Sequence, residues 1–204
     1  MSKAVAEKLI SLQRRFIWSK EDGRHGMPLV LQEGVLSQDI TSYSFTKTIW
    51  KGVVLPRVEL FAWFVLTDMV NTKERLSRLG ILNQDDQSCV LCNKEIEQIH
   101  HLFLGCDFAW QVWSAWLYVF GRLWSLPGLM KDHFLSWTEE PRRKEDRKQQ
   151  LRCFCAIIWN IWLERNRRIF QNRSRGVEEI INMSMFNCDE WRGVSSCCRW
   201  LCRI

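Results

Sequence analysis

Three cysteines and two histidines lie close together near the middle of the chain. Cys89 and Cys92 are two residues apart, and His100, His101 and Cys106 follow after a polar stretch. A Cys-x2-Cys turn directs two thiolates at one point, and three cysteines with one histidine are a common tetrahedral ligand set for structural Zn²⁺. We therefore predict one closed zinc site formed by Cys89, Cys92, His101 and Cys106, with His100 as the alternative fourth ligand.

Two other interpretations of these cysteines stay open. Free cysteines are common in protein cores, and a Cys-x-x-Cys pair can be a redox centre. A redox pair, however, needs no downstream His-x4-Cys, and residues 93–98 are too polar for a core segment. Glu97 lies one helical turn before His101. It either orients the free N–H of the imidazole, as carboxylates beside zinc-bound histidines often do, or is an exposed helix residue.

Composition and charge indicate a folded protein with a basic C-terminal third. The chain has 204 residues, of which 47% are hydrophobic and twelve are tryptophan, too many for a disordered chain. Residues 141–204 hold fourteen Lys and Arg against seven Asp and Glu, and residues 1–140 hold fifteen against sixteen. All the excess positive charge therefore lies in the last third.

The nine cysteines would suit a secreted disulfide scaffold only with an export signal. The N-terminus opens with charged residues and lacks an apolar signal core, and no apolar stretch is long enough to span a membrane. We therefore expect reduced thiols and an intracellular location, in the nucleus or the cytoplasm. Beyond the three candidate ligands, Cys188 and the C-terminal cysteines match no metal motif. The cysteines without an assigned role are Cys153, Cys155, Cys188, Cys197, Cys198 and Cys202.

Hydrophobic spacing predicts a mainly α fold. Helices are expected over residues 5–18, 58–69, 73–79 and 110–127, from the basic stretch 141–150 to about residue 170, and from residue 177 onward. Thr72 is a plausible N-cap for the third helix, and Gly80 is its expected end.

Trp110, Trp113 and Trp116 share one face of the expected fourth helix. Such a stripe can stack on nucleic-acid bases, but more often it packs in a core. We expect it to pack on the helix that carries Phe61 and Trp63, over the zinc unit.

Basic residues crowd both ends of the long C-terminal helix. Cations near a helix C-terminus suit the helix dipole, but a cluster of them also suits contacts to phosphates. The candidate nucleic-acid-binding residues are Arg142, Arg143, Lys144, Arg165, Arg167 and Arg168.

The central residues resemble a known family. Trp50, Leu55-Pro56, Leu60-Phe61-Ala62-Trp63 and Gly80-Ile81, followed by the Cys/His pattern and Glu97, are similar to the zinc-binding domain of plant LINE-type (non-LTR) reverse transcriptases over about residues 45–116. The resemblance implies Zn²⁺ bound by Cys89, Cys92, His101 and Cys106, with Glu97 as the adjoining acid.

The flanking segments resemble the same retroelements less closely. Residues 7–18 are similar to the segment after the polymerase core, and residues 158–170 to the segment after the zinc domain. This implies three parts: a remnant over 1–44, the zinc-binding domain over 45–125 and a basic helical region over 138–204. The aromatic-x-Asp-Asp turn that holds the polymerase metal ions is absent, since Asp85-Asp86 follows Asn83-Gln84.

We therefore expect no enzymatic activity from this chain, although the parent family is an RNA-directed DNA polymerase. The leading hypothesis is a non-catalytic zinc-binding module that binds RNA or DNA without sequence specificity through its basic C-terminal region. The alternatives are a protein-interaction scaffold that uses the aromatic surface, and a retroelement remnant without function.

Overall fold

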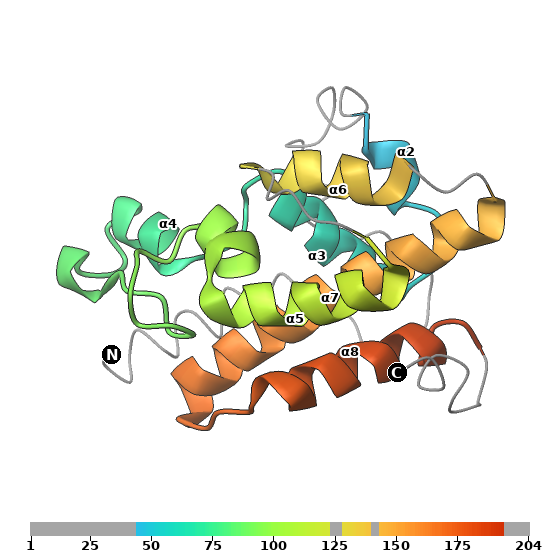
Figure 1. Ribbon diagram of the computed structural model, residues 1–204. Helices are drawn as coiled ribbons and strands as arrows, with labels where there is room; N and C mark the ends of the chain where they lie inside the picture. The colour runs from blue at the N-terminus through green and yellow to red at the C-terminus, as the bar shows by residue number, and fades with distance from the viewer. Residues whose placement is uncertain (1–43, 123–127, 140–142, 194–204) are drawn as a thin grey trace, which may run out of the picture. The chain divides into compact units, whose positions relative to one another are not determined.

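A computed structural model describes residues 44–122, 128–139 and 143–193 (Figure 1). The chain divides into two compact units, residues 1–48 and 49–204. Helix α2 (Thr46–Ile49) lies at their boundary. The described residues form helices and no strand, apart from one isolated antiparallel bridge between Ser88 and Ile96. The predicted mainly α fold is therefore confirmed.

The second unit contains the metal-ligand candidates and the long C-terminal helices. Its elements in chain order are α3 (Pro56–Leu66), α4 (Lys73–Arg78), η3 (Gln84–Asp86), η4 (His101–Gly105), α5 (Asp107–Phe120), α6 (Met130–Glu139), α7 (Lys144–Gln171) and α8 (Val177–Glu190).

Helix α4 begins and ends close to the predicted 73–79, whereas α3 begins at Pro56 and ends at Leu66 rather than at residue 69. Pro56 occupies the first turn of α3, where its missing N–H is not needed, and the helix is buried from Val58 to Leu66. The Thr72 side chain accepts a hydrogen bond from the Arg75 N–H at the start of α4. Gly80 follows α4 with φ 68°, the left-handed conformation that ends many helices.

Helix α7 is the central helix of this unit. It contacts α3, α5, α6 and α8, and Figure 1 shows α8 running back along it. Phe154, Ile157, Ile158 and Ile161 are each fully buried, as their spacing predicts. The helix ends at Gln171, and Asn172 adopts a left-handed conformation there with φ 51°.

The tryptophan stripe of α5 is mostly core. Trp113 is 0% exposed and Trp116 is 5% exposed, whereas Trp110 is 39% exposed. The Trp113 ring packs against Phe154 of α7 and Trp137 of α6, and Trp116 Nε1 donates to Ser184 Oγ of α8 at 2.9 Å.

The stripe lies over the zinc unit as expected, since Trp113 Nε1 donates to the Phe103 carbonyl of η4 at 2.6 Å. The expected packing on α3 is wrong, because the main helix partners of α5 are α7 and α8. Phe61 of α3 packs instead against Trp159 and Trp162 of α7, with ring centroids 5.3 and 5.6 Å apart. Spacing shows which side of a helix is apolar, but not which helix covers it.

Helix α6 is not predicted by the sequence analysis. Helix α5 ends at Phe120, with Gly121 at φ 62°, rather than at residues 127–128, and α6 begins at Met130. The signal was present in the sequence, because Met130, Phe134 and Trp137 recur at helical spacing. His133, Phe134 and Trp137 are buried.

Several expectations lie outside the described residues. They include the helix over 5–18 and the remnant over 1–44, so the division into 1–44, 45–125 and 138–204 stays a prediction. Across the described ranges, no helix is both long and apolar enough to cross a membrane.

We predict that His133 makes folding stability depend on pH. Burial, and then the nearby charge of Arg122, lower the pKa of His133 from 6.5 to about 3. Below about pH 6.5 the unfolded chain therefore binds a proton that the folded chain excludes. Its contribution to stability is complete above that pH and is lost as the pH falls toward 3.

Between pH 7 and pH 5 the parent should lose about 2 kcal/mol more unfolding free energy than His133→Phe. Urea unfolding of both proteins at each pH measures the difference. Acid effects on the cysteine-rich site are common to both proteins and cancel. Equal losses in the two proteins would contradict the assignment.

Candidate metal centre

The four predicted ligand atoms lie together. The sulfur atoms of Cys89, Cys92 and Cys106 and one imidazole nitrogen of His101 are all within 4.8 Å of one another. Cys89 Sγ is 3.9 Å from Cys106 Sγ, and Cys92 Sγ is 3.2 Å from His101 Nε2. Cys89 and Cys106 are buried, and the other two residues are half-buried.

A tight turn positions the first two cysteines. The Asn93 N–H donates to the Cys89 carbonyl at 2.7 Å, and the Cys89 N–H donates to the Glu95 carbonyl at 2.7 Å. Asn93 has φ 55°, a left-handed conformation that asparagine tolerates better than most residues. The chain therefore reverses directly after Cys92, and the isolated bridge between Ser88 and Ile96 closes the loop.

A wide helical turn positions the other two ligands. In η4 the Cys106 N–H donates to the His101 carbonyl at 2.7 Å, an i to i+5 bond typical of a π-turn, which often occurs at functional sites. Cys106 is also the N-cap of α5. The backbone N–H groups of Phe108 and Ala109 hydrogen-bond to its sulfur, so the start of α5 favours a thiolate at this position.

Cys89 and Cys106 titrate as a pair. The hydrogen bond with Cys106, together with burial, raises the pKa of the Cys89 thiol. The same hydrogen bond lowers the pKa of Cys106. Cys89 therefore holds its proton to a higher pH than Cys106, and a bound cation would displace that proton, because metal ligation requires thiolates.

The structure distinguishes the two histidines. His101 directs Nε2 at the sulfur cluster. His100 Nδ1 accepts a hydrogen bond from the Met130 N–H at 3.3 Å, and His100 Nε2 lies 3.9 Å from Asp68 Oδ1. His100 therefore faces α6 rather than the cysteines, and the geometry favours His101 as the fourth ligand.

Glu95, rather than Glu97, contacts the ligand histidine. Glu95 Oε2 lies 3.1 Å from His101 Nδ1, so it fixes the ring with Nε2 toward the sulfurs. Helical spacing does not predict Glu95, because its contact with His101 depends on the reversal of the chain at Asn93. The expected contact between Glu97 and His101 is wrong.

Glu97 instead forms a buried ion pair with α7. Arg165 Nε and Nη2 donate to Glu97 Oε1 at 3.1 and 2.7 Å, and the Lys73 N–H donates to the same oxygen at 3.0 Å. The side chains of Glu97 and Arg165 are 0% and 1% exposed. The Arg165 guanidinium also lies 4.7 Å from the Trp162 ring centroid. It therefore holds the cysteine-rich loop on α7 and is not available to phosphates, contrary to the sequence prediction.

Arg168 is also committed to internal contacts. It donates to Glu164 Oε1 at 2.7 Å and to the Leu91 carbonyl at 2.9 Å. These contacts use its donors within the protein, so they do not support the predicted contact to phosphates. Arg167 is half-buried, and its Nε has no hydrogen-bond partner within the described ranges.

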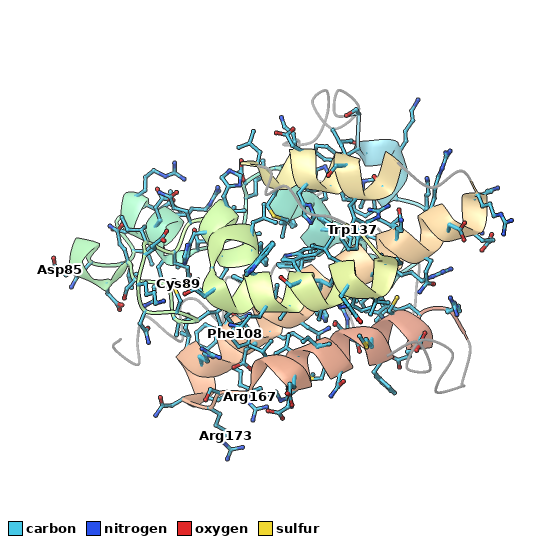
Figure 2. All side chains as sticks on the ribbon, viewed as in Figure 1. Asp85, Cys89, Phe108, Trp137, Arg167 and Arg173 are labelled. Atoms are coloured by element: carbon cyan, nitrogen blue, oxygen red, sulfur yellow. The ribbon has the colours of Figure 1, made fainter. Side chains whose placement is uncertain are left out.

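The remaining candidates for phosphate contact lie near the start of α7. Arg143 and Lys144 are exposed there, whereas Arg142 lies outside the described residues. Figure 2 shows Arg173, beyond the other end of α7, pointing away from the helices. The nucleic-acid role of these residues stays a prediction.

The cysteines without an assigned role include one close pair. Cys153 Sγ of α7 and Cys188 Sγ of α8 are 3.1 Å apart and buried. Burial, and then the hydrogen bond to Cys188, raise the pKa of Cys153, so the Cys153 thiol is a poor nucleophile. Cys155 is also buried, and Cys197, Cys198 and Cys202 lie outside the described residues.

The arrangement of the four ligand atoms fits a tetrahedral cation. Around an ion with Zn–S bonds of about 2.3 Å and a Zn–N bond of about 2.0 Å, two sulfurs lie about 3.8 Å apart, and a sulfur lies about 3.5 Å from a nitrogen. The observed separations of 3.9 and 3.2 Å are close to these values. Binding would contract the longest separation by about 1 Å. Three sulfurs and one imidazole are the ligands that Zn²⁺ prefers over Mg²⁺ or Ca²⁺.

The comparison with protein families agrees with this site. Residues 34–113, which are 80 of the 204, match the family described as zinc-binding in reverse transcriptase. The match contains all four ligand candidates and supports a reverse transcriptase zinc-binding domain in this part of the chain. Searches of the curated proteins and of the solved structures found no match.

We predict that Glu97→Gln strongly destabilises the fold. The change leaves the buried Arg165 without a compensating charge, which typically costs about 3–5 kcal/mol of unfolding free energy. Denaturant unfolding of the parent and the variant measures this loss.

Glu145→Gln is the matched control, because the Glu145 side chain is 73% exposed, lies away from the metal site, and its loss should have little effect on stability. Equal effects of the two substitutions would contradict the buried-pair assignment. The double variant Glu97→Leu/Arg165→Met should recover part of the stability, because it removes both buried charges.

Proposed function

We propose that Cys89, Cys92, His101 and Cys106 bind one Zn²⁺ ion in a structural site. The observation that carries this proposal is the convergence of the four ligand atoms within 4.8 Å. Four protein ligands complete a tetrahedron and leave no position for a reacting water, which is typical of structural zinc sites and not of catalytic ones.

The proposed ion would stabilise a region that is poor in apolar contacts. The loop between Cys92 and His101 contains Asn93, Lys94 and Glu95, all of them exposed. Its buried side chains, Glu97 and Ile99, provide little apolar area. Structural zinc sites contribute about 10–16 kcal/mol of apparent binding free energy, which becomes folding free energy. The ion would therefore join this loop to the start of α5.

We propose further that the chain is a non-catalytic part of a LINE-type reverse transcriptase and acts inside the cell. Template-directed polymerisation needs carboxylates that hold two metal ions. Of the adjacent pair Asp85 and Asp86, Asp86 Oδ1 forms an ion pair with Lys73 Nζ at 2.8 Å. This contact supports a structural role for the carboxylate.

Nucleic acid is the partner that we propose for the basic C-terminal region. Arg143, Lys144 and Arg147 are exposed near the start of α7, with Lys148 half-buried beside them; we call these four residues the basic edge. Glu145 pairs with Lys148 at 2.7 Å, so part of the charge is neutralised locally. Because acidic residues neutralise part of the positive charge in this region, we expect it to bind phosphates weakly and without sequence specificity.

The alternative of a protein-interaction scaffold loses its main support. It depends on an exposed aromatic surface, whereas Trp113 and Trp116 are buried and use their indole N–H groups internally.

Native mass spectrometry tests the zinc site directly. The reduced parent should carry one zinc, and Cys92→Ser/Cys106→Ser should carry none and lose helical signal. The matched control is Cys153→Ala/Cys188→Ala, which also removes two cysteines but should keep the ion. A well-folded parent without zinc would contradict the proposed function.

Salt-dependent binding tests the nucleic-acid partner. The parent should bind a short fluorescent single-stranded RNA, and Arg143→Gln/Lys144→Gln/Arg147→Gln should bind more weakly. The slope of log K against log salt should become shallower by about 2, since each phosphate contact on a single strand contributes about 0.7.

Lys51→Gln/Arg78→Gln/Lys131→Gln is the control of equal charge change, because these three residues are exposed elsewhere on the unit. If both triple variants bind equally, net charge alone explains binding, and the basic edge is not the contact surface.

A further inference from the structure

Arg168 connects the central helix to the turn between the first two ligand cysteines. Its Nη1 donates to the Leu91 carbonyl at 2.9 Å and to the Val90 carbonyl at 3.4 Å. These two residues separate Cys89 from Cys92. Arg168 lies 62 positions after the last ligand and outside the family match over residues 34–113.

The two carbonyls belong to the peptide groups that face the Cys89 sulfur. The Val90 carbonyl shares a peptide group with the Leu91 N–H, and the Leu91 carbonyl shares one with the Cys92 N–H. Both N–H groups hydrogen-bond to the Cys89 sulfur. A cation at the oxygen end of a peptide group polarises it and strengthens the hydrogen bond that its N–H donates. Arg168 therefore acts on the Cys89 sulfur through two peptide groups, without touching it.

The Arg168 side chain is held rigidly in this position. Its Nε donates to Glu164 Oε1 at 2.7 Å, and the Glu164 side chain is 0% exposed. Its Nη2 donates to the Arg175 carbonyl at 3.3 Å, and its guanidinium lies 4.7 Å from the Phe108 ring centroid. Glu164 Oε1 also accepts the Arg175 N–H at 2.8 Å. Because the guanidinium is fixed on three sides, little entropy is lost when it orients the turn.

We propose that Arg168 is a positioning residue of the metal site, so that the metal-binding unit includes α7 and the loop after it. This inference rests on the proposed zinc site. Groups that orient metal ligands from outside typically change metal affinity by 10- to 100-fold when they are replaced. Arg168 differs from a general stabiliser of the fold, because its donors reach the backbone that joins two of the ligands.

The test compares zinc affinities of the full chain, measured by competition with a chromogenic chelator. Arg168→Met should bind Zn²⁺ about 10- to 100-fold more weakly than the parent. Arg168→Lys keeps the charge beside Glu164 but lacks the planar fork of donors, so it should fold and still bind more weakly. Arg173→Met, at an exposed position shortly after α7, should bind as the parent does.

A second measurement separates positioning from general stability. In amide NMR spectra of the zinc-loaded proteins, the Leu91 and Cys92 N–H protons should move upfield in both Arg168 variants, because their bonds to sulfur weaken. Ser184→Ala breaks the contact with Trp116 at a place that is not linked to the turn. It should lower the thermal stability without changing these resonances or the zinc affinity.

The outcomes distinguish this inference from the proposed function. A parent that binds no zinc contradicts the zinc site itself. A parent that binds zinc, with Arg168→Lys folded and within twofold of its affinity, overturns the role of Arg168 and leaves the zinc site intact. The role of Arg168 is also overturned if Ser184→Ala weakens zinc binding as much as Arg168→Lys does. If Arg168→Met does not fold, Arg168→Lys decides.

Discussion

The buried ion pair between Glu97 and Arg165 links the cysteine-rich loop to the rest of the second unit. Both side chains are almost fully excluded from solvent, and breaking such a pair leaves a charge that the interior cannot solvate. The loop follows a bend set by Asn93 and supplies few apolar contacts of its own. Its position therefore depends on a charge carried by a helix far along the chain. The same helix supplies Arg168 to the turn between Cys89 and Cys92.

Helix α7 consequently has two roles: it forms the centre of the apolar core, and it holds the cysteine-rich loop. Phe154, Ile157, Ile158 and Ile161 form the centre of the apolar core, in contact with α3, α5, α6 and α8. One helical turn after Ile161, the side chains of Arg165 and Arg168 contact the cysteine-rich loop. Arginine suits this place because its planar group bonds to carboxylates, carbonyls and aromatic rings at once. The dense basic segment is thus partly an internal scaffold, and only its exposed members are suited to phosphate.

Local rules account for much of the fold. The start of α3, both ends of α4, the end of α7 and the start of α8 follow from Pro56, Thr72, Gly80 and the spacing of apolar residues, because these effects act within one or two helical turns. Helix α6 was not predicted, although Met130, Phe134 and Trp137 recur at helical spacing and are buried. Which helix covers the α5 tryptophans was also not predictable, because spacing reports an apolar face and not its partner.

The sequence by itself determined the type of site: three thiols and an imidazole at this spacing suit one soft tetrahedral cation, and ligand chemistry depends on residue type. Tertiary structure decided what surrounds them. In the folded chain His101, rather than His100, faces the sulfurs, and Glu95 contacts the His101 ring. Glu97 pairs with Arg165, and Arg168 donates to the turn between the first two cysteines. The reason is physical: a charged side chain takes its role from the groups that the fold brings within about 3 Å of it, and many of those groups are distant in sequence.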